Sequence, residues 1–320
     1  MNNWWFICIA LIIEIVLYSF FIKVFKKQKI GQSIRKEGPK SHINKKGTPT
    51  MGGLIFGVLI LIGYLLGLKL INEPINIYPT MVIIVTILGY GVLGFLDDYL
   101  IVIKHNNDGI SPTIKFIVQI IIAVVIFFIL LNNNHSTVIN IFGVKFDFTF
   151  VYGLFIIIFL SGTTNAVNLT DGLDGLASGL LIIAFIGTLV LGLLKENLQI
   201  TLYSSCLIAS LLAFLIFNFN PAKIFMGNAG SLMFGSILAT QFVLLEEEMM
   251  LLIIAFVFII ETLSVIIQVT YFKITKGKRI FLMAPLHHHY EKKGNSEVMV
   301  DLLFWIFGLL ALMMLLIAIL

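Results

Sequence analysis

Residues 79–100 read PTMVIIVTILGYGVLGFLDDYL, and the eighteen residues from Pro79 to Leu96 carry no charge before Asp97 and Asp98 follow as an adjacent pair. An uncharged run of this length is typical of a helix that crosses a bilayer. A charge at the bilayer centre costs about 2.5–3.5 kcal/mol on insertion scales, so the pair should lie at the membrane edge. The stretch therefore predicts a membrane span with a polar site at one end.

The whole chain has the composition of a polytopic membrane protein. Of its 320 residues, 59% are hydrophobic and only 12% are charged, which lies outside the range of soluble globular proteins. No polar interval is long enough for a soluble domain, so residues 1–320 are expected to form one membrane domain. The first apolar run lacks the basic leader and small-residue cleavage site of a secretory signal, and we expect it to be the first span.

Apolar runs separated by polar breaks predict an all-α fold of ten transmembrane helices. The expected spans lie near residues 4–22, 50–68, 79–96, 113–131, 150–167, 176–194, 200–217, 230–245, 249–271 and 300–319. One short hairpin is expected between spans, around Val138 to Phe148.

Basic residues are distributed unequally between the alternating loops. Of the 21 lysines and arginines, only Lys69, Lys145 and Lys195 fall outside the set formed by the loops near 23–49, 97–112 (with Lys115 just inside the next span), 165–175, 218–229 and 272–299. The positive-inside rule makes this set cytoplasmic and both termini extracytoplasmic. The polar motifs all belong to this set, so the active site should be formed by cytoplasmic loops.

Asp97 and Asp98 are candidate metal ligands and catalytic groups. At a helix C-terminus, negative charge opposes the helix dipole, and adjacent like charges repel each other. Mg²⁺ prefers oxygen ligands and binds substrate phosphates, so it would relieve both effects. A solvated helix end is the alternative interpretation.

The motif NAVNLTDGLDGLASG spaces its polar side chains at every third residue: Asn165, Asn168, Asp171 and Asp174. This spacing places neighbours on adjoining faces of a helix or turn, so two amides and two carboxylates could converge on one ligand. Such a set suits recognition of a nucleobase or ribose, or completion of a metal shell. A glycine-rich loop that caps the next helix is the alternative.

The motif NFNPAKIFMGNAGS, which begins at Asn218, has glycines on both sides of Asn228, where the backbone can approach a ligand closely. Phe225 offers a flat face for a base to stack on, and Asn218 is a further candidate for substrate binding. A glycine-rich helix entry explains the same residues without a ligand.

Two further loops carry cations. The first cytoplasmic loop is strongly basic, which is typical of a segment that binds anionic lipid, and Lys45 is the lysine expected near the substrate. In APLHHHYE, His287, His288 and His289 are consecutive and lack the spacing of a tetrahedral zinc site, so hydrogen bonding to phosphate is expected. Together these groups suit phosphoryl transfer onto a lipid.

Five motifs, GPKSHINKKGTPTMGG, FLDDYL, NAVNLTDGLDGLA, PAKIFMG and APLHHHYE, occur in this order between about residues 34 and 291. With ten spans, they resemble the phospho-N-acetylmuramoyl-pentapeptide transferase (MraY) family, within the polyprenyl-phosphate N-acetylhexosamine-1-phosphate transferase superfamily. The resemblance implies a multi-pass protein of the bacterial cytoplasmic membrane. It would transfer phospho-MurNAc-pentapeptide from UDP-MurNAc-pentapeptide to undecaprenyl phosphate with Mg²⁺, giving lipid I and UMP for peptidoglycan. A homodimer is implied, and no nucleic acid is expected as a partner.

The resemblance also implies residue roles. The implied catalytic residues are Asp97, Asp98, Lys45, Lys115, His287, His288 and His289, with Asp98 as the base for the lipid phosphate. Implied substrate-binding residues are Thr50, Asn165, Asn168, Asp171, Asp174 and Phe225, the last packing against uracil; metal ligands are Asp97, Asp98 and the residue at position 228.

Two positions depart from the family pattern. Asn228 stands where the family has a metal-binding aspartate, and Ile101 stands where a lysine is usual, although Lys104 lies one turn beyond. An amide oxygen can coordinate Mg²⁺ but brings no charge, so metal binding should be weaker. Transfer of another UDP-sugar phosphate, or a weakly active homologue that serves as a membrane scaffold, are therefore alternatives. A transporter is less well supported, because no inverted repeat is visible.

Overall fold

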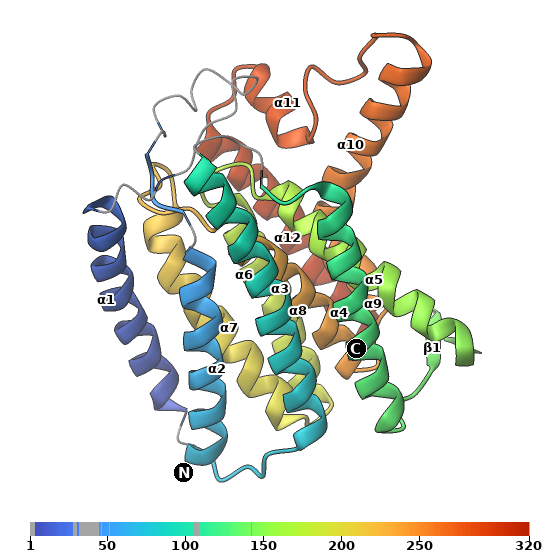
Figure 1. Cartoon of the computed structure of the whole chain (residues 1–320). Coiled ribbons are helices and arrows are strands. Elements are labelled where there is room, and N and C mark those ends of the chain that lie inside the picture. Colours follow the sequence, from blue (N-terminus) through green and yellow to red (C-terminus); the bar gives the residue numbers. More distant parts are fainter. Residues whose placement is uncertain are drawn as a thin grey trace.

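The computed structural model describes residues 4–27, 31, 45, 47–50, 52–104, 109–141 and 143–319 (Figure 1). Most of the basic first loop, for which lipid binding was predicted, lies outside these residues.

The described chain is mostly helical. Its helices are α1 (Trp5–Lys27), α2 (Gly52–Leu70), α3 (Ile77–Lys104), α4 (Pro112–Asn132), α5 (Tyr152–Thr170), α6 (Leu176–Leu194), α7 (Leu198–Asn218), α8 (Gly227–Leu244), α9 (Met250–Ile254), α10 (Phe256–Ile274), α11 (Leu286–Lys292) and α12 (Glu297–Ile319). Eight of the described helices, α1, α3 to α7, α10 and α12, are long and apolar enough to cross a membrane. The predicted polytopic helical membrane protein is confirmed at this level.

The predicted hairpin is confirmed too, so the fold is not purely helical. Strands β1 (Val138–Ile141) and β2 (Val144–Asp147) pair antiparallel between α4 and α5. Two helix boundaries differ from the prediction. The run near 249–271 is interrupted at Ala255, between α9 and α10, and α3 continues to Lys104 rather than ending before the aspartate pair.

Helix α8 forms the centre of the bundle, packed against α2, α3, α5 and α6. All its residues from Ala229 to Val243 are buried, and many are small or polar. Gly94 of α3 faces the backbone carbonyl of Asn228 so closely that a Cβ there would collide with it. Because small residues let helix backbones approach closely, α8 is surrounded by protein rather than lipid, which explains its modest hydropathy.

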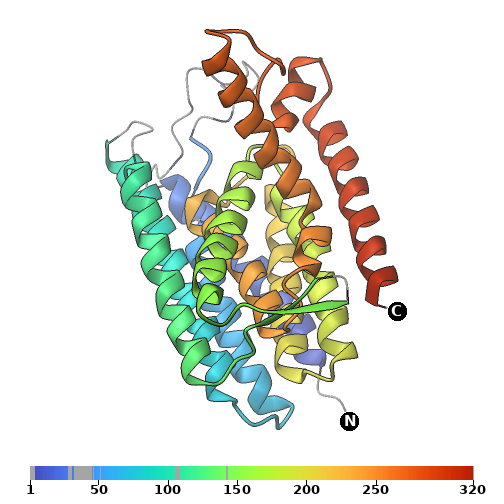
Figure 2. The same cartoon turned by 90° about the vertical axis from the view of Figure 1, so that its right-hand side faces the viewer.

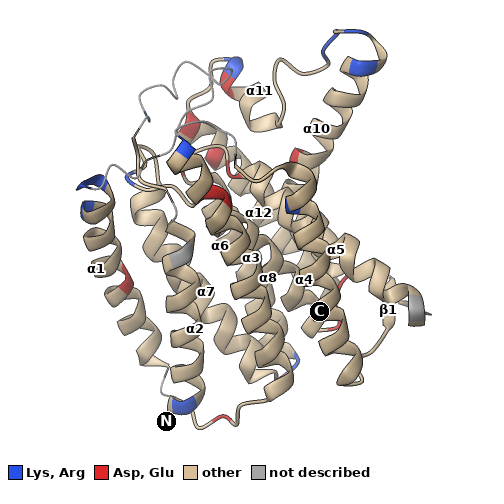
Figure 3. Cartoon of the chain, in the orientation of Figure 1, with Lys and Arg blue, Asp and Glu red and all other residues tan. Residues whose placement is uncertain are grey.

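Charged side chains gather at the end of the bundle where α1, α3 and α10 finish and where α11 lies (Figure 3). The two chain termini lie away from this end (Figure 2). Apolar side chains exposed along α1, α4 and α12 suit contact with lipid. The charged end is therefore where the predicted site residues can meet.

Candidate active site

Asp97 and Asp98 lie within α3 and are both buried, so the prediction that they end a helix was wrong. The Asp98 oxygens accept the backbone N–H groups of Asn228 and Ala229, each at 3.0 Å, in the first turn of α8. The N-terminus of a helix stabilises negative charge. The protein itself thus compensates part of the charge of Asp98, which the sequence argument assigned to a cation alone.

Gly227 makes this contact possible. Its φ is +71°, a conformation that side chains other than glycine rarely adopt. A Cβ at Gly227 would also collide with Asp98 Oδ2 and lie 2.8 Å from Thr50 Oγ1. Thr50, which was predicted to bind substrate, is buried. Its hydroxyl and Asp98 Oδ2 both lie close to Gly227.

Asp97 is neutralised by a different element, the start of α4. Its Oδ2 lies 2.6 Å from Lys115 Nζ, and its Oδ1 accepts the Ile110 N–H at 2.7 Å. Ser111 caps α4 and Pro112 occupies its first turn, which fixes the helix start beside α3. Lys115, for which the resemblance implies a catalytic role, is thus paired with Asp97.

Asn228, in the position where a carboxylate was expected, belongs to the same group. Its Oδ1 accepts a hydrogen bond from Asn168 Nδ2 at 2.7 Å. Asn168 Nδ2 also donates to Ser231 Oγ at 2.7 Å. We call Asp97, Asp98, Lys115, Asn168 and Asn228 the aspartate cluster.

Asp171 follows the last turn of α5, near this cluster. Its enclosure by protein, together with repulsion from Asp98 and Asp174, raises its pKa to about 7. Carboxylates that repel one another in this way are suited to sharing a cation.

The donor set fits Mg²⁺. Among the described residues, no three His, Cys, Asp or Glu side chains form a ready metal site. Mg²⁺, however, usually takes one or two carboxylates and completes its octahedron with water and substrate phosphates. Asp98, Asp171 and the amide oxygen of Asn228 supply that kind of set.

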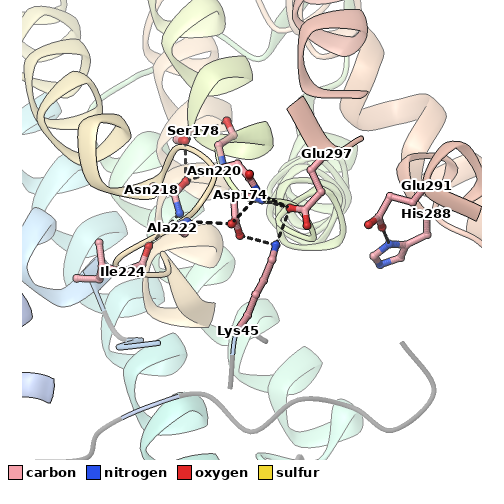
Figure 4. Close-up of polar contacts among 11 residues, drawn as sticks. Lys45, Asp174, Ser178, Asn218, Asn220, Ala222, Ile224, His288, Glu291 and Glu297 are labelled. Atoms are coloured by element: carbon pink, nitrogen blue, oxygen red, sulfur yellow. Dashed lines mark hydrogen bonds and ion pairs between the residues drawn. The ribbon is translucent and has the colours of Figure 1, made fainter. Parts of the chain in front are cut away.

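A second group, the lysine cluster, comprises Lys45, Asp174, Asn220 and Glu297 (Figure 4). Lys45 Nζ lies 2.7 Å from Asp174 Oδ1 and 2.5 Å from Glu297 Oε2. Asp174 Oδ2 accepts from Ala222 N–H at 3.0 Å and from Asn220 Nδ2 at 3.2 Å. The Lys45 ammonium thus joins the loop after α5 to the first turn of α12, and Asp174 binds the loop after α7.

The four residues spaced by three do not converge on one point. Asn165 donates to Gln119 Oε1 on α4 at 2.9 Å. Asn168 belongs to the aspartate cluster and Asp174 to the lysine cluster, because the helix ends between them and the chain turns.

Asn218 is the last residue of α7, and Phe225 lies on the loop between α7 and α8. Asn218 is buried, accepts from Gly175 N–H at 3.1 Å and donates to Ile224 O at 3.0 Å, so it ties two site loops together (Figure 4). Phe225 is half-buried, and its backbone N–H donates to Pro49 O at 2.8 Å. The predicted substrate loops therefore lie side by side.

The three histidines have different surroundings. His287 is buried against Glu261 of α10, and His288 Nδ1 lies 2.7 Å from Glu291 Oε2. His289 Nδ1 accepts the Leu282 N–H at 3.1 Å, and its pKa is lowered by partial desolvation and by Lys293. As expected for consecutive residues, they do not point to one site.

Sequence reasoning missed Gln119, Asn220, Glu261 and Glu297. Glu261 had a signal, since it is a lone carboxylate within an apolar run, where ionisable residues mark functional sites. The others became visible only through contacts between segments far apart in sequence.

Comparison with known proteins shows the family of the chain. The profile of glycosyl transferase family 4 matches residues 80–246, and phospho-N-acetylmuramoyl-pentapeptide-transferase signature 1 matches residues 45–56. Proteins named phospho-N-acetylmuramoyl-pentapeptide-transferase are similar along nearly the whole chain. Those of Staphylococcus saprophyticus subsp. saprophyticus and Staphylococcus carnosus are 48% and 46% identical, each over 94% of both chains, and that of Staphylococcus aureus is 45% identical over 95% of both. The chain therefore belongs to the phospho-N-acetylmuramoyl-pentapeptide-transferase family.

Proposed function

We propose that this protein transfers phospho-MurNAc-pentapeptide from UDP-MurNAc-pentapeptide to undecaprenyl phosphate, which gives lipid I and UMP. A phosphate oxygen of the lipid forms a bond to the phosphorus next to the sugar. The bond from this phosphorus to the UMP oxygen breaks, and UMP leaves with the electron pair.

The observation that carries the proposal is the aspartate cluster itself. Asp97, Lys115, Asp98 and the first turn of α8 meet at the charged end of a membrane bundle, in a chain about 45–48% identical to proteins named for this reaction. Phosphoryl transfer depends mainly on positioning and on compensation of charge, which such a group provides.

The proposed role of each site residue follows from its position. Asp98 is the group best placed to orient the lipid phosphate or take its proton, since it is held firmly by α8. Lys115 and Lys45 offer ammonium groups to phosphate oxygens, at the cost of loosening their present ion pairs. Phe225, Asn218 and Asp174 lie on or beside the loops that would bind the uridine.

Mg²⁺ is part of the proposal. Asp98, Asp171 and Asn228 would hold it, with Asp97 beside them, and when bound it would neutralise charge on the diphosphate. The pKa of Asp171 is raised first by burial and then by the neighbouring carboxylates Asp98 and Asp174, and a cation bound here would relieve that repulsion.

The membrane arrangement is proposed from the charge distribution. With α2 and α8 added to the eight candidate spans, the bundle has ten spans, both termini outside the cell and the active site on the cytoplasmic face. UDP-sugars are made in the cytoplasm, so this orientation gives the site its substrate. A homodimer in the cytoplasmic membrane is included, by analogy with the family.

The test uses purified protein with UDP-MurNAc-pentapeptide, undecaprenyl phosphate and Mg²⁺, and follows UMP release. We expect release that needs both substrates and stops with EDTA. No release, or release only with a different UDP-sugar, would reject the proposal. UDP-N-acetylglucosamine serves as the competing donor.

A further inference from the structure

Glu261 is a carboxylate inside an otherwise apolar helix. It lies on α10, most of which faces outward, yet its side chain is 0% exposed. A buried charge without partners costs several kcal/mol, so its partners must compensate it.

Both partners of Glu261 come from one residue, His287 at the start of α11. Glu261 Oε1 accepts the backbone N–H of His287 at 3.2 Å, and Oε2 lies 3.2 Å from His287 Nδ1. A carboxylate in its ionised form only accepts hydrogen bonds, and with that form of Glu261 the pair requires a proton on Nδ1. The bond to the backbone N–H fixes the position of His287. The contact with Nδ1 fixes the orientation of the His287 ring and favours one tautomer.

The other ring nitrogen, Nε2, is directed at Gly172. It is buried and has no hydrogen-bond partner among the described residues. A Cβ on Gly172 would collide with Nε2 and lie 2.9 Å from Cε1, so the ring faces this glycine directly. Gly172 lies in the turn between Asp171 and Asp174, which joins the aspartate cluster to the lysine cluster.

A buried polar atom without a partner is unfavourable by about 1–3 kcal/mol, and native proteins keep few of them. The arrangement makes sense when Nε2 forms its bond only with a bound ligand. A histidine whose Nδ1 is held by a carboxylate is the usual way to present Nε2 in a defined state.

We propose that Glu261 is a positioning residue that holds His287 as the Nδ1–H tautomer, so that Nε2 accepts a hydrogen bond from the P–OH group of a phosphate monoester at the Asp171–Asp174 turn. In the proposed function this monoester is the lipid phosphate, so the catalytic meaning of the pair rests on that function. The tautomer of His287 and the orientation of its ring do not depend on the proposed function.

Kinetics of Glu261→Gln test the catalytic part, with Glu14→Gln as the matched control. Glu14 is another buried carboxylate of a membrane helix, but it lies on α1 outside the site. We expect Glu261→Gln to lower kcat about 10–100-fold with KM for the UDP-sugar changed less than about twofold. Glu14→Gln should keep kcat near wild type, and Glu261→Asp should recover part of the loss.

A double-mutant cycle separates positioning from a general structural role. If Glu261 acts through His287, the double variant Glu261→Gln/His287→Asn should be no slower than His287→Asn alone. Independent, multiplying losses would overturn the proposal, as would wild-type kcat in Glu261→Gln.

A spectroscopic readout keeps the inference testable without turnover. In ¹⁵N-histidine spectra of the solubilised protein, the His287 signal, assigned by its loss in His287→Asn, should show Nδ1–H in the wild type and change in Glu261→Gln. An Nε2–H signal in the wild type would overturn the proposal. Absence of UMP release with an Nδ1–H signal would instead reject the proposed function and leave the pair intact.

Discussion

Replacing Asp98 by asparagine removes one charge and one acceptor from the centre of the site. In the structure, Asp98 accepts two backbone N–H groups, one on each oxygen, both at 3.0 Å. Asparagine keeps one acceptor oxygen but sets an NH₂ group against the second N–H. A hydrogen bond to a charged group contributes about 1.5–3 kcal/mol, and removal of a buried charge offsets part of this loss, so the free energy of unfolding should fall by no more than that amount. The protein should stay folded in detergent, with an apparent Tm lower by a few degrees.

The effect on turnover should be larger. Loss of a base or metal-binding carboxylate typically lowers the rate by 10²–10⁴, so UMP release by Asp98→Asn should fall at least about a hundredfold. Initial rates at saturating substrates and Mg²⁺, measured beside thermal unfolding of the same preparation, separate this effect from the loss of stability.

The matched control is Asp147→Asn in the exposed hairpin. Asp147 accepts from Thr137 Oγ1 at 2.7 Å and from Thr149 N–H at 2.9 Å with the same oxygen, Oδ1, so asparagine can keep both bonds. Its UMP release should equal that of the wild type. A rate for Asp98→Asn within about threefold of the wild type would refute the role assigned to Asp98.

Three further predictions address metal, stability and topology. Asn228→Asp should lower the Mg²⁺ concentration for half-maximal UMP release, because a carboxylate holds this cation better than an amide; an unchanged titration would remove position 228 from the metal shell. Lys45→Gln should lower the apparent Tm more than Glu297→Gln, because it leaves two carboxylates, Asp174 and Glu297, without this ammonium; equal shifts would contradict this reading of the lysine cluster. A reporter active only in the cytoplasm, inserted in the loop at 275–279, should be active, and activity after Leu320 instead would reverse the proposed orientation.

The sequence predicted the membrane class and the helical runs well, because both depend on local composition. It placed the hairpin correctly for the same reason. It misjudged α3, because the aspartate pair was read as the end of a helix. In the structure the first turn of α8 donates hydrogen bonds to Asp98, and Lys115 pairs with Asp97. The helix therefore continues through both aspartates to Lys104.

The three-residue spacing from Asn165 to Asp174 shows the limit of periodicity. The pattern indicates a shared face only while the helix lasts, and α5 ends at Thr170. Beyond that residue, the direction of Asp174 is decided by Lys45 and Asn220, which no local pattern identifies.

The sequence by itself determined that this chain is a membrane protein, because hydropathy acts segment by segment, and its count of basic residues predicted that the polar motifs share one side of the membrane. Only the tertiary structure decided which groups meet. Asp98 and Asn228 are 130 residues apart, and Lys45 and Glu297 are 252 apart. The bundle brings them together because α8 packs on all sides against protein, and a contact formed by such packing leaves no trace in the spacing of residues along the chain.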